Sequence, residues 1–531
     1  MSFTKCLLLV VACFFSSAMV FSKEYNILDY GAVNDTTVIS GNAIQKAIDD
    51  CNKNGGGKVV FPAGNYATGT LFLKSNVFLY LDAGATLYGS RDLKDYIAVK
   101  PAFVSLRTQE ATIQLIYAEN TVNTGISGFG VIDGRGSNFK KLSWNDEGLT
   151  RPHLLRFIQC ENVQVEGVTL RNSGCWMQHY LACEKVQLRG LKIFNHNNFN
   201  NDGIDIDGCR NVTISDIISD SDDDGITLKS TSDRACENVT ITNCVVSSHC
   251  NAIKLGTESN AGFKNINITN CVVKPSSVSA SKFFGAPEGT SGLSLEIVDG
   301  GVMQQVAVNN ITIDGTLSPL FIRLANRARP FKKDMLINSI GELGDVLISN
   351  IQIKNAKRLG CSITGMPGHP VNRIRFSNIA IAFEGGVASD SAYKIVPEKE
   401  KDYPDAGMFG VLPAYGFFIR HAANISFDGL SLFTNKPDGR PAFYMDDVKG
   451  IEISNSSLMS GRSNIADIIL SSSANVLVKN NSLKGDSNCF VKLVDNGSSG
   501  IAILDNYLPG AVKIVEADKS SPAPVVERGN K

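Results

Sequence analysis

Short runs in which apolar and polar residues alternate recur along most of the chain. The segments "ENVQVEGVTLRNS", "EKVQLRGLKIFNH", "RNVTISDIISDSD", "ENVTITNCVVSSH" and "KNINITNCVVKPS" place an equivalent apolar residue at Val163, Val186, Val212, Val239 and Ile266, about 23 to 27 residues apart. Each unit is rich in Val and Ile and is bounded by Gly, Asn and Asp, which indicates short strands separated by turns. The chain is therefore built from one repeated unit.

Strands that recur at this period, with no helix between them, predict an all-β fold, a single-stranded parallel β-helix. In such a solenoid each coil stacks on the previous one and buries one face of every strand. A β-propeller is the second choice, because its units are longer, at about 40 to 50 residues.

Two columns of identical residues support this stacking. Free cysteine behaves as a small buried hydrophobe, so we interpret the cysteine column as an interior ladder rather than as disulfides or metal ligands. Asparagine side chains in a column can hydrogen-bond to the coils above and below. The cysteines stand three residues before the recurring apolar position, and the asparagines one residue before it: Cys160, Cys183, Cys209 and Cys236, and Asn162, Asn211, Asn238 and Asn265.

The two ends of the chain differ from the repeats. "SGNAIQKAIDDCNKNGGG" has Ser40 at a plausible N-cap, an apolar face and terminal glycines, so it predicts an amphipathic helix that caps the solenoid. We expect the β-helix to span residues 23–518, with an insertion at about 384–420, and a polar tail at 519–531.

Residues 1–22 have the pattern of a secretory signal peptide: a lysine, a short apolar run and small residues. Cys13 leaves lipoprotein anchoring as a less favoured alternative. Export would place the protein in the periplasm, at the cell surface or in the medium. The 51 Lys and Arg residues balance 52 Asp and Glu, so charge gives no reason to expect nucleic acid or a membrane surface as a partner. We expect no membrane span and a monomer.

The candidate chemistry lies between residues 200 and 230, where "NDGIDI" and "DDGITL" occupy adjacent coils. Asp202 and Asp224 hold equal positions in these coils, about 4.8 Å apart along the axis, and Asp223 precedes Asp224. Carboxylates this close raise the pKa of at least one member. A protonated and an ionised carboxyl group are what glycosidic hydrolysis requires. The alternative is that these Asp-Gly pairs only form turns.

"NNDGID" followed by "DDGITLKS" resembles the signatures of glycoside hydrolase family 28, the polygalacturonases and related pectin hydrolases. "DYGAVND", "IYAENTVNTGISGFGVIDGRG" and "RPHLLRFIQCENVQVEGVTLRNSGCWMQHYLACEKV" extend the resemblance over most of the chain, in the manner of bacterial members. The resemblance implies a right-handed β-helix, no metal or other cofactor, and inverting single-displacement hydrolysis. It makes Asp223 the proton donor, and Asp202 and Asp224 the carboxylates that activate water.

Two family motifs are altered. Where the family has "GHG", this chain has "SSHCNAIKLG"; we take His249 as the catalytic match, although Asn251 stands in the histidine's column. The family's "RIK", which holds a substrate carboxylate, corresponds to Ser294, Leu295 and Glu296, so both cations are missing.

Replacement charges are expected from the outward-facing column. We place Lys254 and Arg323 in one row with Ser294, and Lys229 and Glu296 beside it. Together with Asn251 these residues are the predicted substrate-binding set. Trp176, His179 and four residues in or beside the insertion are further candidates for the cleft wall, with packing as the alternative: Tyr403, Phe409, Tyr415 and Arg420.

The favoured function is cofactor-independent hydrolysis of α-linked galacturonate-containing pectin. The missing "RIK" keeps a rhamnogalacturonan or another mixed pectic backbone open as the substrate. A β-helical polysaccharide lyase and a non-catalytic glycan-binding solenoid are the alternatives from other classes. The residues do not distinguish internal cleavage from cleavage at chain ends.

Overall fold

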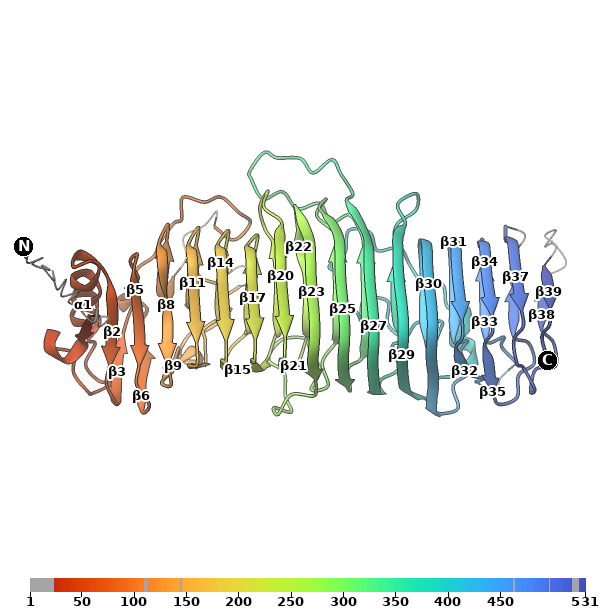
Figure 1. Cartoon of the computed structure of the whole chain (residues 1–531), viewed down its shortest axis with the longest axis horizontal. Coiled ribbons are helices and arrows are strands. Elements are labelled where there is room, and N and C mark those ends of the chain that lie inside the picture. The colour runs from red at the N-terminus through yellow and green to blue at the C-terminus, as the bar shows by residue number, and fades with distance from the viewer. Residues whose placement is uncertain (1–22, 109–112, 144–145, 462–463, 496, 518–524) are drawn as a thin grey trace, which may run out of the picture.

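The computed structural model describes residues 23–108, 113–143, 146–461, 464–495, 497–517 and 525–531. The predicted signal segment and Cys13 lie outside these residues. The chain forms an elongated solenoid with its two ends at opposite poles (Figure 1). All strand pairs of the named strands are parallel, as expected for a right-handed parallel β-helix. In the part of the chain just listed, no helix is both long and apolar enough to cross a bilayer.

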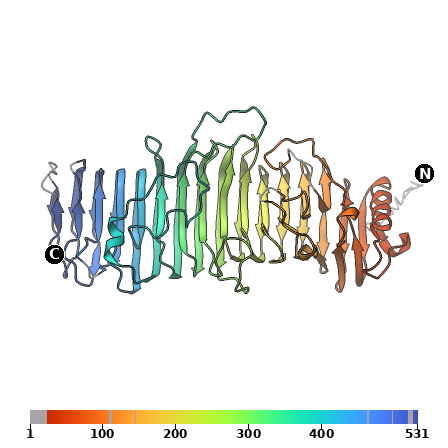
Figure 2. The same ribbon diagram turned by 180° about the vertical axis from the view of Figure 1, so that it is seen from behind.

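Three parallel stacks of strands run along the solenoid, and the same stacks are seen from behind in Figure 2. The first stack contains β1 (Glu24–Asn26), β2 (Gly57–Phe61), β5 (Val77–Leu81), β8 (Val122–Gly128), β11 (Glu161–Glu166), β14 (Glu184–Arg189), β17 (Arg210–Ser215), β20 (Cys236–Thr242), β23 (Gly262–Val273), β25 (Val302–Asp314), β27 (Glu342–Ala356), β29 (Val371–Gly385), β30 (Phe417–Lys436), β31 (Phe443–Ser454), β34 (Ala474–Lys479), β37 (Ser499–Leu504) and β39 (Val526–Arg528).

The second stack contains β3 (Gly64–Thr68), β6 (Ala85–Gly89), β9 (Val131–Asp133), β12 (Thr169–Arg171), β15 (Lys192–Asn195), β18 (Ile218–Ser221), β21 (Val245–Ser248), β32 (Ser457–Met459) and β35 (Ser482–Lys484), and the long strands β23, β25, β27, β29 and β30 run through it. The third stack contains β4 (Leu71–Phe72), β7 (Gln114–Glu119), β10 (His153–Ile158), β13 (Gln178–Leu181), β16 (Ile204–Asp207), β19 (Ile226–Ser230), β22 (Asn251–Ser259), β24 (Ser291–Ile297), β26 (Ser318–Leu324), β28 (Cys361–Thr364), β33 (Ile468–Ser471), β36 (Val491–Leu493) and β38 (Val515–Ala517), and the first residues of β30 and β31 run through it between β28 and β33.

The predicted columns are confirmed. The recurring apolar residues lie in one continuous buried core, and all eleven cysteines between residues 23 and 531 are free and buried. On the surface, Asn238 donates to Asn211 at 3.1 Å and Asn265 donates to Asn238 at 2.7 Å. These asparagines have φ near 56–58°, a left-handed conformation that asparagine tolerates better than most residues. The ladder therefore explains both the residue type and its period.

The predicted cap is the helix α1 (Gly41–Lys53), which buries Ile44, Ala47 and Ile48 against the first coils. Ser40 precedes the helix but does not cap it with its side chain; its hydroxyl accepts from the Val33 amide instead. Four short 3₁₀ helices complete the fold: η1 (Ile27–Tyr30), η2 (Leu93–Asp95), η3 (Gly136–Asn138) and η4 (Ser389–Tyr393).

The insertion occupies residues 386–416, between β29 and β30. At the C-terminal end, β39 pairs with β37 through Ala502 and Val526. The predicted limit of the solenoid at residue 518 is therefore too early, because the sequence assigned to a polar tail adds one more strand to the first stack.

Candidate active site

The three predicted aspartates come together where the chain enters the third stack. Asp202 stands two residues before β16, Asp224 stands two residues before β19, and β16 and β19 pair with Ile204 opposite Ile226. Oxygens from Asp202, Asp223 and Asp224 all lie within 4.8 Å of one another. The stacked carboxylates deduced from the repeat are thus present.

These carboxylates line a pocket of about 560 Å³. Its walls come from three regions far apart in the sequence: Trp176 before β13, Phe283 and Phe284 in the loop after β23, and Tyr403 in the insertion. Phe284 and Tyr403 meet edge to face, with ring centroids 6.2 Å apart. The remaining lining residues are polar or charged: Arg107, Glu147, Asn200, Lys229, Glu258 and Arg327.

Burial raises the pKa of two of the three aspartates, Asp223 and Asp202. Desolvation, and then the charge of Asp224, raise the pKa of Asp223 well above its usual range. Desolvation and the charge of Asp223 do the same to Asp202. Asp223 is only 7% exposed, so it lies in the pocket wall rather than freely in solvent. A carboxylic acid that stays protonated near neutral pH is suited to giving a proton to a leaving oxygen.

Asp224 has a different environment, because both of its oxygens have partners. Its Oδ1 accepts from Nδ2 of Asn251 at 2.6 Å, and its Oδ2 lies 3.3 Å from Nζ of Lys254. Asn251 is itself fixed by the Ser291 hydroxyl at 2.6 Å. A cation and an amide donor stabilise the carboxylate form, which is the form that accepts a proton from water.

Lys229 links Asp202 to a second acidic group. Its Nζ lies 3.9 Å from Asp202, 3.6 Å from Asp205 and 3.5 Å from Glu258. Its pKa is raised because these carboxylates outweigh the effect of burial. Lys229 lines the pocket, and its Nζ lies 4.5 Å from the centroid of the Trp176 ring.

Lys254 and Glu296 are close to the carboxylates but not free to bind substrate. Lys254 is 1% exposed and lies between Asp224 and Glu296, at 3.3 and 4.0 Å. Glu296 is fully buried and accepts hydrogen bonds from Ser294 and Thr257. Burial raises the pKa of Glu296 to about 7. Lys254 therefore forms an ion pair with Asp224, and Glu296 lies on the other side of the Lys254 ammonium group.

Arg323 lies elsewhere, so its prediction as a site residue is wrong. In the strand register Arg323 stands opposite Glu296, whereas the row of Lys254 continues through Ser294 to Phe321. The predicted alignment of this coil was therefore displaced by two residues. The Arg323 guanidinium donates to the carbonyls of Gly365, Glu398 and Lys399, and so holds the insertion on the solenoid.

The insertion residues divide in the same way. Tyr403 lines the pocket, whereas Arg420 donates to the Val396 and Pro397 carbonyls, and Tyr415 donates to that of Met459. Phe409 packs in a separate apolar cluster under the insertion. Of the earlier pair, Trp176 lines the pocket, and His179 is buried against Asp207 at 3.0 Å.

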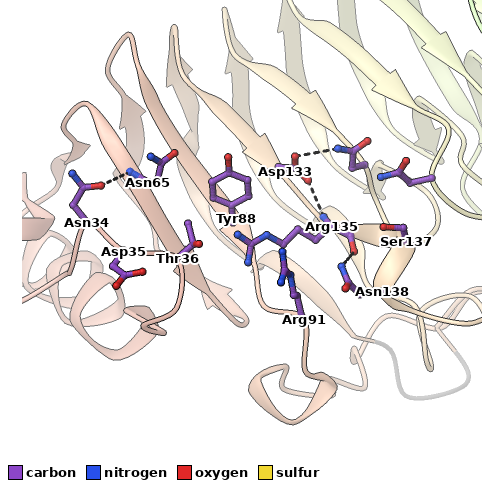
Figure 3. Close-up of a pocket in the computed structure, with 12 residues that line it drawn as sticks. Asn34, Asp35, Thr36, Asn65, Tyr88, Arg91, Asp133, Arg135, Ser137 and Asn138 are labelled. Carbon is purple, nitrogen blue, oxygen red and sulfur yellow. Dashed lines mark hydrogen bonds between the residues drawn. The ribbon is translucent and has the colours of Figure 1, made fainter.

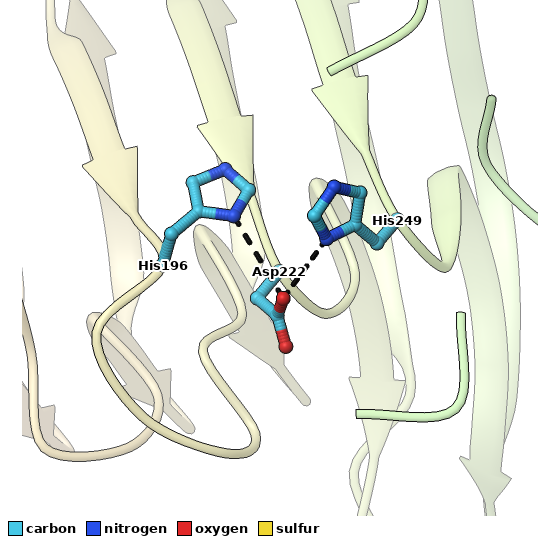
Figure 4. Close-up of side chains that lie close together, drawn as sticks. All are labelled: His196, Asp222 and His249. Carbon is cyan, nitrogen blue, oxygen red and sulfur yellow. Dashed lines mark hydrogen bonds and ion pairs between the residues drawn. The ribbon is translucent and has the colours of Figure 1, made fainter. Parts of the chain in front are cut away.

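His249 does not lie among the three pocket aspartates, contrary to its predicted position. It is fully buried, with Nδ1 2.9 Å from Asp222 and Nε2 2.7 Å from the Val278 carbonyl (Figure 4). A carbonyl only accepts, so Nε2 donates to Val278, while Nδ1 faces the Asp222 carboxylate. Asn251, not His249, contacts Asp224.

This histidine belongs to a network that anchors the loop carrying Phe283. Asp222 lies between the rings of His249 and His196 and accepts from the backbone amides of Lys282 and Phe283. Burial would raise the pKa of Asp222, but hydrogen bonds from the two histidines and from the backbone lower it below its usual range. The network thus fixes one aromatic wall of the pocket.

Among the residues that the structure describes, two groups place atoms that could ligate a metal within 4.8 Å of one another. One is His196, Asp222 and His249, and the other is the three aspartates. In the first set both nitrogens of His249 already have hydrogen-bond partners. In the second, Lys229 and Lys254 supply positive charge beside the carboxylates.

Arg327 is one of several pocket residues that the repeat did not predict. It stands in "ANRARP", beyond the end of β26, and its Cζ lies 5.0 Å from the centroid of the Tyr403 ring. Its Nη1 is buried without a hydrogen-bond partner, and among the described residues no carboxylate pairs with it. By contrast, the nearby Arg329 pairs with Glu258 and Asp299. The pocket therefore contains one cation available to an anionic ligand.

The sequence matches the family model "Glycosyl hydrolases family 28" over residues 51–316, which contain the aspartates, Asn251 and Lys254. The chain belongs to glycosyl hydrolases family 28. It is 30% identical over 215 residues to a probable polygalacturonase of Vitis vinifera, covering 39% of this chain and 44% of the relative. It is 28% identical over 255 residues to an exo-poly-alpha-D-galacturonosidase of Dickeya chrysanthemi, covering 39% and 42%. The matches span less than half the length of these two curated relatives.

Solved structures of family 28 have the same fold. The family 28 exopolygalacturonase of Yersinia enterocolitica superposes with a TM-score of 0.63 at 20% identity, over 81% of this chain and 78% of that one. The exopolygalacturonase of Thermotoga maritima gives a TM-score of 0.57 at 23% identity, over 68% and 87%. These similarities establish the β-helix.

Proposed function

We propose that the protein hydrolyses the backbone of a galacturonate-containing pectic polysaccharide. Asp223 gives a proton to the oxygen of the leaving sugar, and Asp224 removes a proton from the attacking water, which Asp202 helps to hold. Each proton transfer of this kind typically contributes about 10²- to 10⁴-fold to the rate. The N-terminal signal pattern supports export, which would bring the enzyme to an extracellular polymer.

The observation that carries this proposal is the difference between adjacent carboxylates in one pocket. The pKa of Asp223 is raised by burial and by its neighbour, whereas Asp224 has a lysine and an amide as partners. A carboxyl group with a raised pKa, beside a second carboxyl group that has cationic and amide partners, can serve as an acid and a base. The Oδ1 atom of Asp202 is buried without a hydrogen-bond partner in the protein, which leaves it available to water or a sugar hydroxyl.

Arg327 supports a uronate as the bound sugar. The motif position that would supply cations holds Ser294, Leu295 and Glu296, and all three are buried. The unpaired guanidinium of Arg327 faces the same pocket from a different strand end. Guanidinium groups bind carboxylates through paired, charge-assisted hydrogen bonds. The aromatic walls provide apolar surface for the sugar rings.

We propose inversion at the anomeric carbon, in keeping with the family. The family carries this proposal rather than the carboxylate spacing. Inverting enzymes typically have carboxyl groups about 6.5–9.5 Å apart, and oxygens of the three aspartates here lie within 4.8 Å of one another. Proton NMR of the first-formed product tests it: the β-anomer is expected from an α-linked substrate, and the α-anomer would contradict it.

A mixed pectic backbone is the second candidate substrate. Loss of both cations at the "RIK" position favours a neutral sugar there, and the chain is 29% identical over 218 residues to a probable rhamnogalacturonase A of Aspergillus oryzae. The presence of Arg327 favours the first candidate, because a uronate offers this guanidinium a charged partner, whereas a neutral sugar offers only uncharged acceptors.

The direct experiment is to incubate the protein with homogalacturonan and with rhamnogalacturonan side by side and to measure new reducing ends. Greater release from homogalacturonan is expected, and release from rhamnogalacturonan alone would select the second candidate. Absorbance in the ultraviolet from an unsaturated product, together with loss of activity in a chelator, would show a lyase. Binding without new reducing ends from either polymer would show a non-catalytic glycan-binding protein.

A further inference from the structure

A second polar cavity lies nearer the N-terminal end of the solenoid (Figure 3). It has a volume of about 720 Å³ and is lined almost entirely by polar side chains. Tyr88 at the end of β6 contributes its only aromatic ring, and Arg91 and Arg135 point into it from two successive coils. Five asparagines complete much of the lining: Asn34, Asn65, Asn138, Asn172 and Asn197.

The two arginines have no carboxylate partner among the described residues. The guanidinium carbon of Arg135 lies 4.3 Å from the centroid of the Tyr88 ring, so the ring supports the cation. The nearby Asp133 makes no ion pair with this guanidinium: its Oδ2 accepts from Arg171 and Asn172, and its Oδ1 accepts from the Arg135 backbone amide. Burial and the charge of Arg91 lower the pKa of Arg135. Two cations are thus held close together without an anion between them.

The backbone of Arg135 is arranged for this position. Its φ is 50°, a left-handed conformation that arginine rarely adopts, and its carbonyl accepts from Asn138 Nδ2 at 2.7 Å. Together with the Asp133 hydrogen bond to the Arg135 amide, this fixes the turn after β9. The arginine is therefore presented to the cavity by a constrained turn and not by a freely moving loop.

The opposite end of the cavity accepts hydrogen bonds. Asp35 lies there beside Asn34, across the cavity from the arginines in Figure 3. A hydrogen bond from the Thr37 amide lowers the pKa of Asp35, so it is a carboxylate at neutral pH. A pyranose ring with a carboxylate at one edge and hydroxyls at the other matches this separation of charge.

The cavity lies at the same corner of the solenoid as the aspartates. Arg135 and Asn172 follow β9 and β12, and Asn197 follows β15, whereas Asp202 lies between β15 and β16, and Asp223 follows β18. Coils stack at about 4.8 Å, so the arginines lie roughly 10 to 15 Å from Asp202 along the axis. A polymer bound at Asp202 can reach this cavity within a few sugar units.

We propose that this cavity is a second binding site for a uronate residue of the same polymer, with the sugar carboxylate between Arg91 and Arg135. The identity of the polymer rests on the proposed function. Binding at both places makes the second contact intramolecular, which raises the effective concentration of the polymer at the aspartates. The site would thus act on long chains and not on short ones.

The test uses the full chain with Asp223→Asn, so that trigalacturonate is bound without being cleaved, and calorimetry to count binding sites. Two sites per chain are expected. Adding Arg91→Gln and Arg135→Gln should remove one site, or weaken it by at least about tenfold, because charge-assisted hydrogen bonds are lost. Galactotriose, which has the same length but no carboxylates, should not occupy the second site.

A single trigalacturonate site in the Asp223→Asn protein, with or without the arginine substitutions, would overturn the inference. Equal occupancy of the second site by galactotriose would also overturn it. Displacement of trigalacturonate from this site by millimolar phosphate would show a general anion site and would overturn it too. In the enzyme with Asp223 intact, Arg91→Gln with Arg135→Gln should leave trigalacturonate cleavage unchanged and lower kcat/KM on polymeric homogalacturonan. Equal kcat/KM on the polymer would also overturn it. Failure of the proposed function is distinguishable, because it would appear as no cleavage of either substrate by the unsubstituted protein.

Discussion

Asn251 Nδ2 donates a 2.6 Å hydrogen bond to Oδ1 of Asp224, one coil away, in the column where the family has histidine. The Asn251 amide thus stands where a histidine of the family is expected, and its oxygen accepts a hydrogen bond from the Ser291 hydroxyl. We therefore assign Asn251 the role of positioning Asp224.

Replacing Asn251 by Ala should lower kcat about 10- to 100-fold with little change in KM, because a hydrogen bond to a charged group is removed from the base and not from the substrate. Steady-state kinetics on homogalacturonan measures both constants. Asn251→His restores a donor and should recover much of the rate, whereas an equally inactive histidine variant would contradict the positioning role.

Arg327→Gln should lower kcat/KM on homogalacturonan roughly 10- to 100-fold, since the substrate carboxylate loses its charge-assisted partner. The matched control is Arg373→Gln, which removes an exposed arginine paired with Asp345 on the first stack. Normal kcat/KM in the Arg327 variant would show that the uronate is held elsewhere.

The His196 network should make stability depend on pH. Burial would lower the pKa of His196, but hydrogen bonds to Asp220 and Asp222 raise it above 6.5. A histidine whose pKa is raised by folding stabilises the protein fully below pH 6.5, and this contribution disappears as pH rises through the folded-state pKa. Denaturant unfolding at pH 5.5 and pH 9 should therefore show His196→Gln to be destabilised on the order of 1 kcal/mol more at the lower pH.

The exposed His369 provides the comparison for this measurement, because it lies outside the network of His196, Asp220 and Asp222. Asp220 also accepts from Ser276 and Ser277, in the same loop that carries Phe283. The His196 variant should accordingly raise KM at low pH. Equal destabilisation at pH 5.5 and pH 9 would rule out the charged network.

The sequence period was sufficient to predict every feature that repeats from coil to coil. It located the asparagine ladder, the buried cysteines and the vertical contact between Asp202 and Asp224, because equal positions in successive coils must stack. The aspartates form the site only because two adjacent coils carry them.

The period failed where coil length changes. Between β22 and β19 the register shifts after Leu228, and the next coil is lengthened by the loop that carries Phe283. The row of Lys254 was correct as far as Ser294, but in the following coil it was extended to Arg323 instead of Phe321. Arg327 and Phe284 lie on loops beyond strand ends, where no repeat fixes a position, and the burial of His249 depends on the Val278 carbonyl in such a loop.

The most direct test of the account is the rate of reducing-end release from homogalacturonan by the Asp223→Asn variant. Oδ1 of the asparagine can still accept a hydrogen bond from the Asp224 backbone amide, as Oδ1 of Asp223 does at 2.9 Å. The thermal unfolding midpoint should therefore stay close to that of the unsubstituted protein. The rate should fall at least about 100-fold, because the amide has no proton to give to the leaving oxygen. A folded variant that releases reducing ends at the original rate would contradict the assignment of Asp223 as the acid.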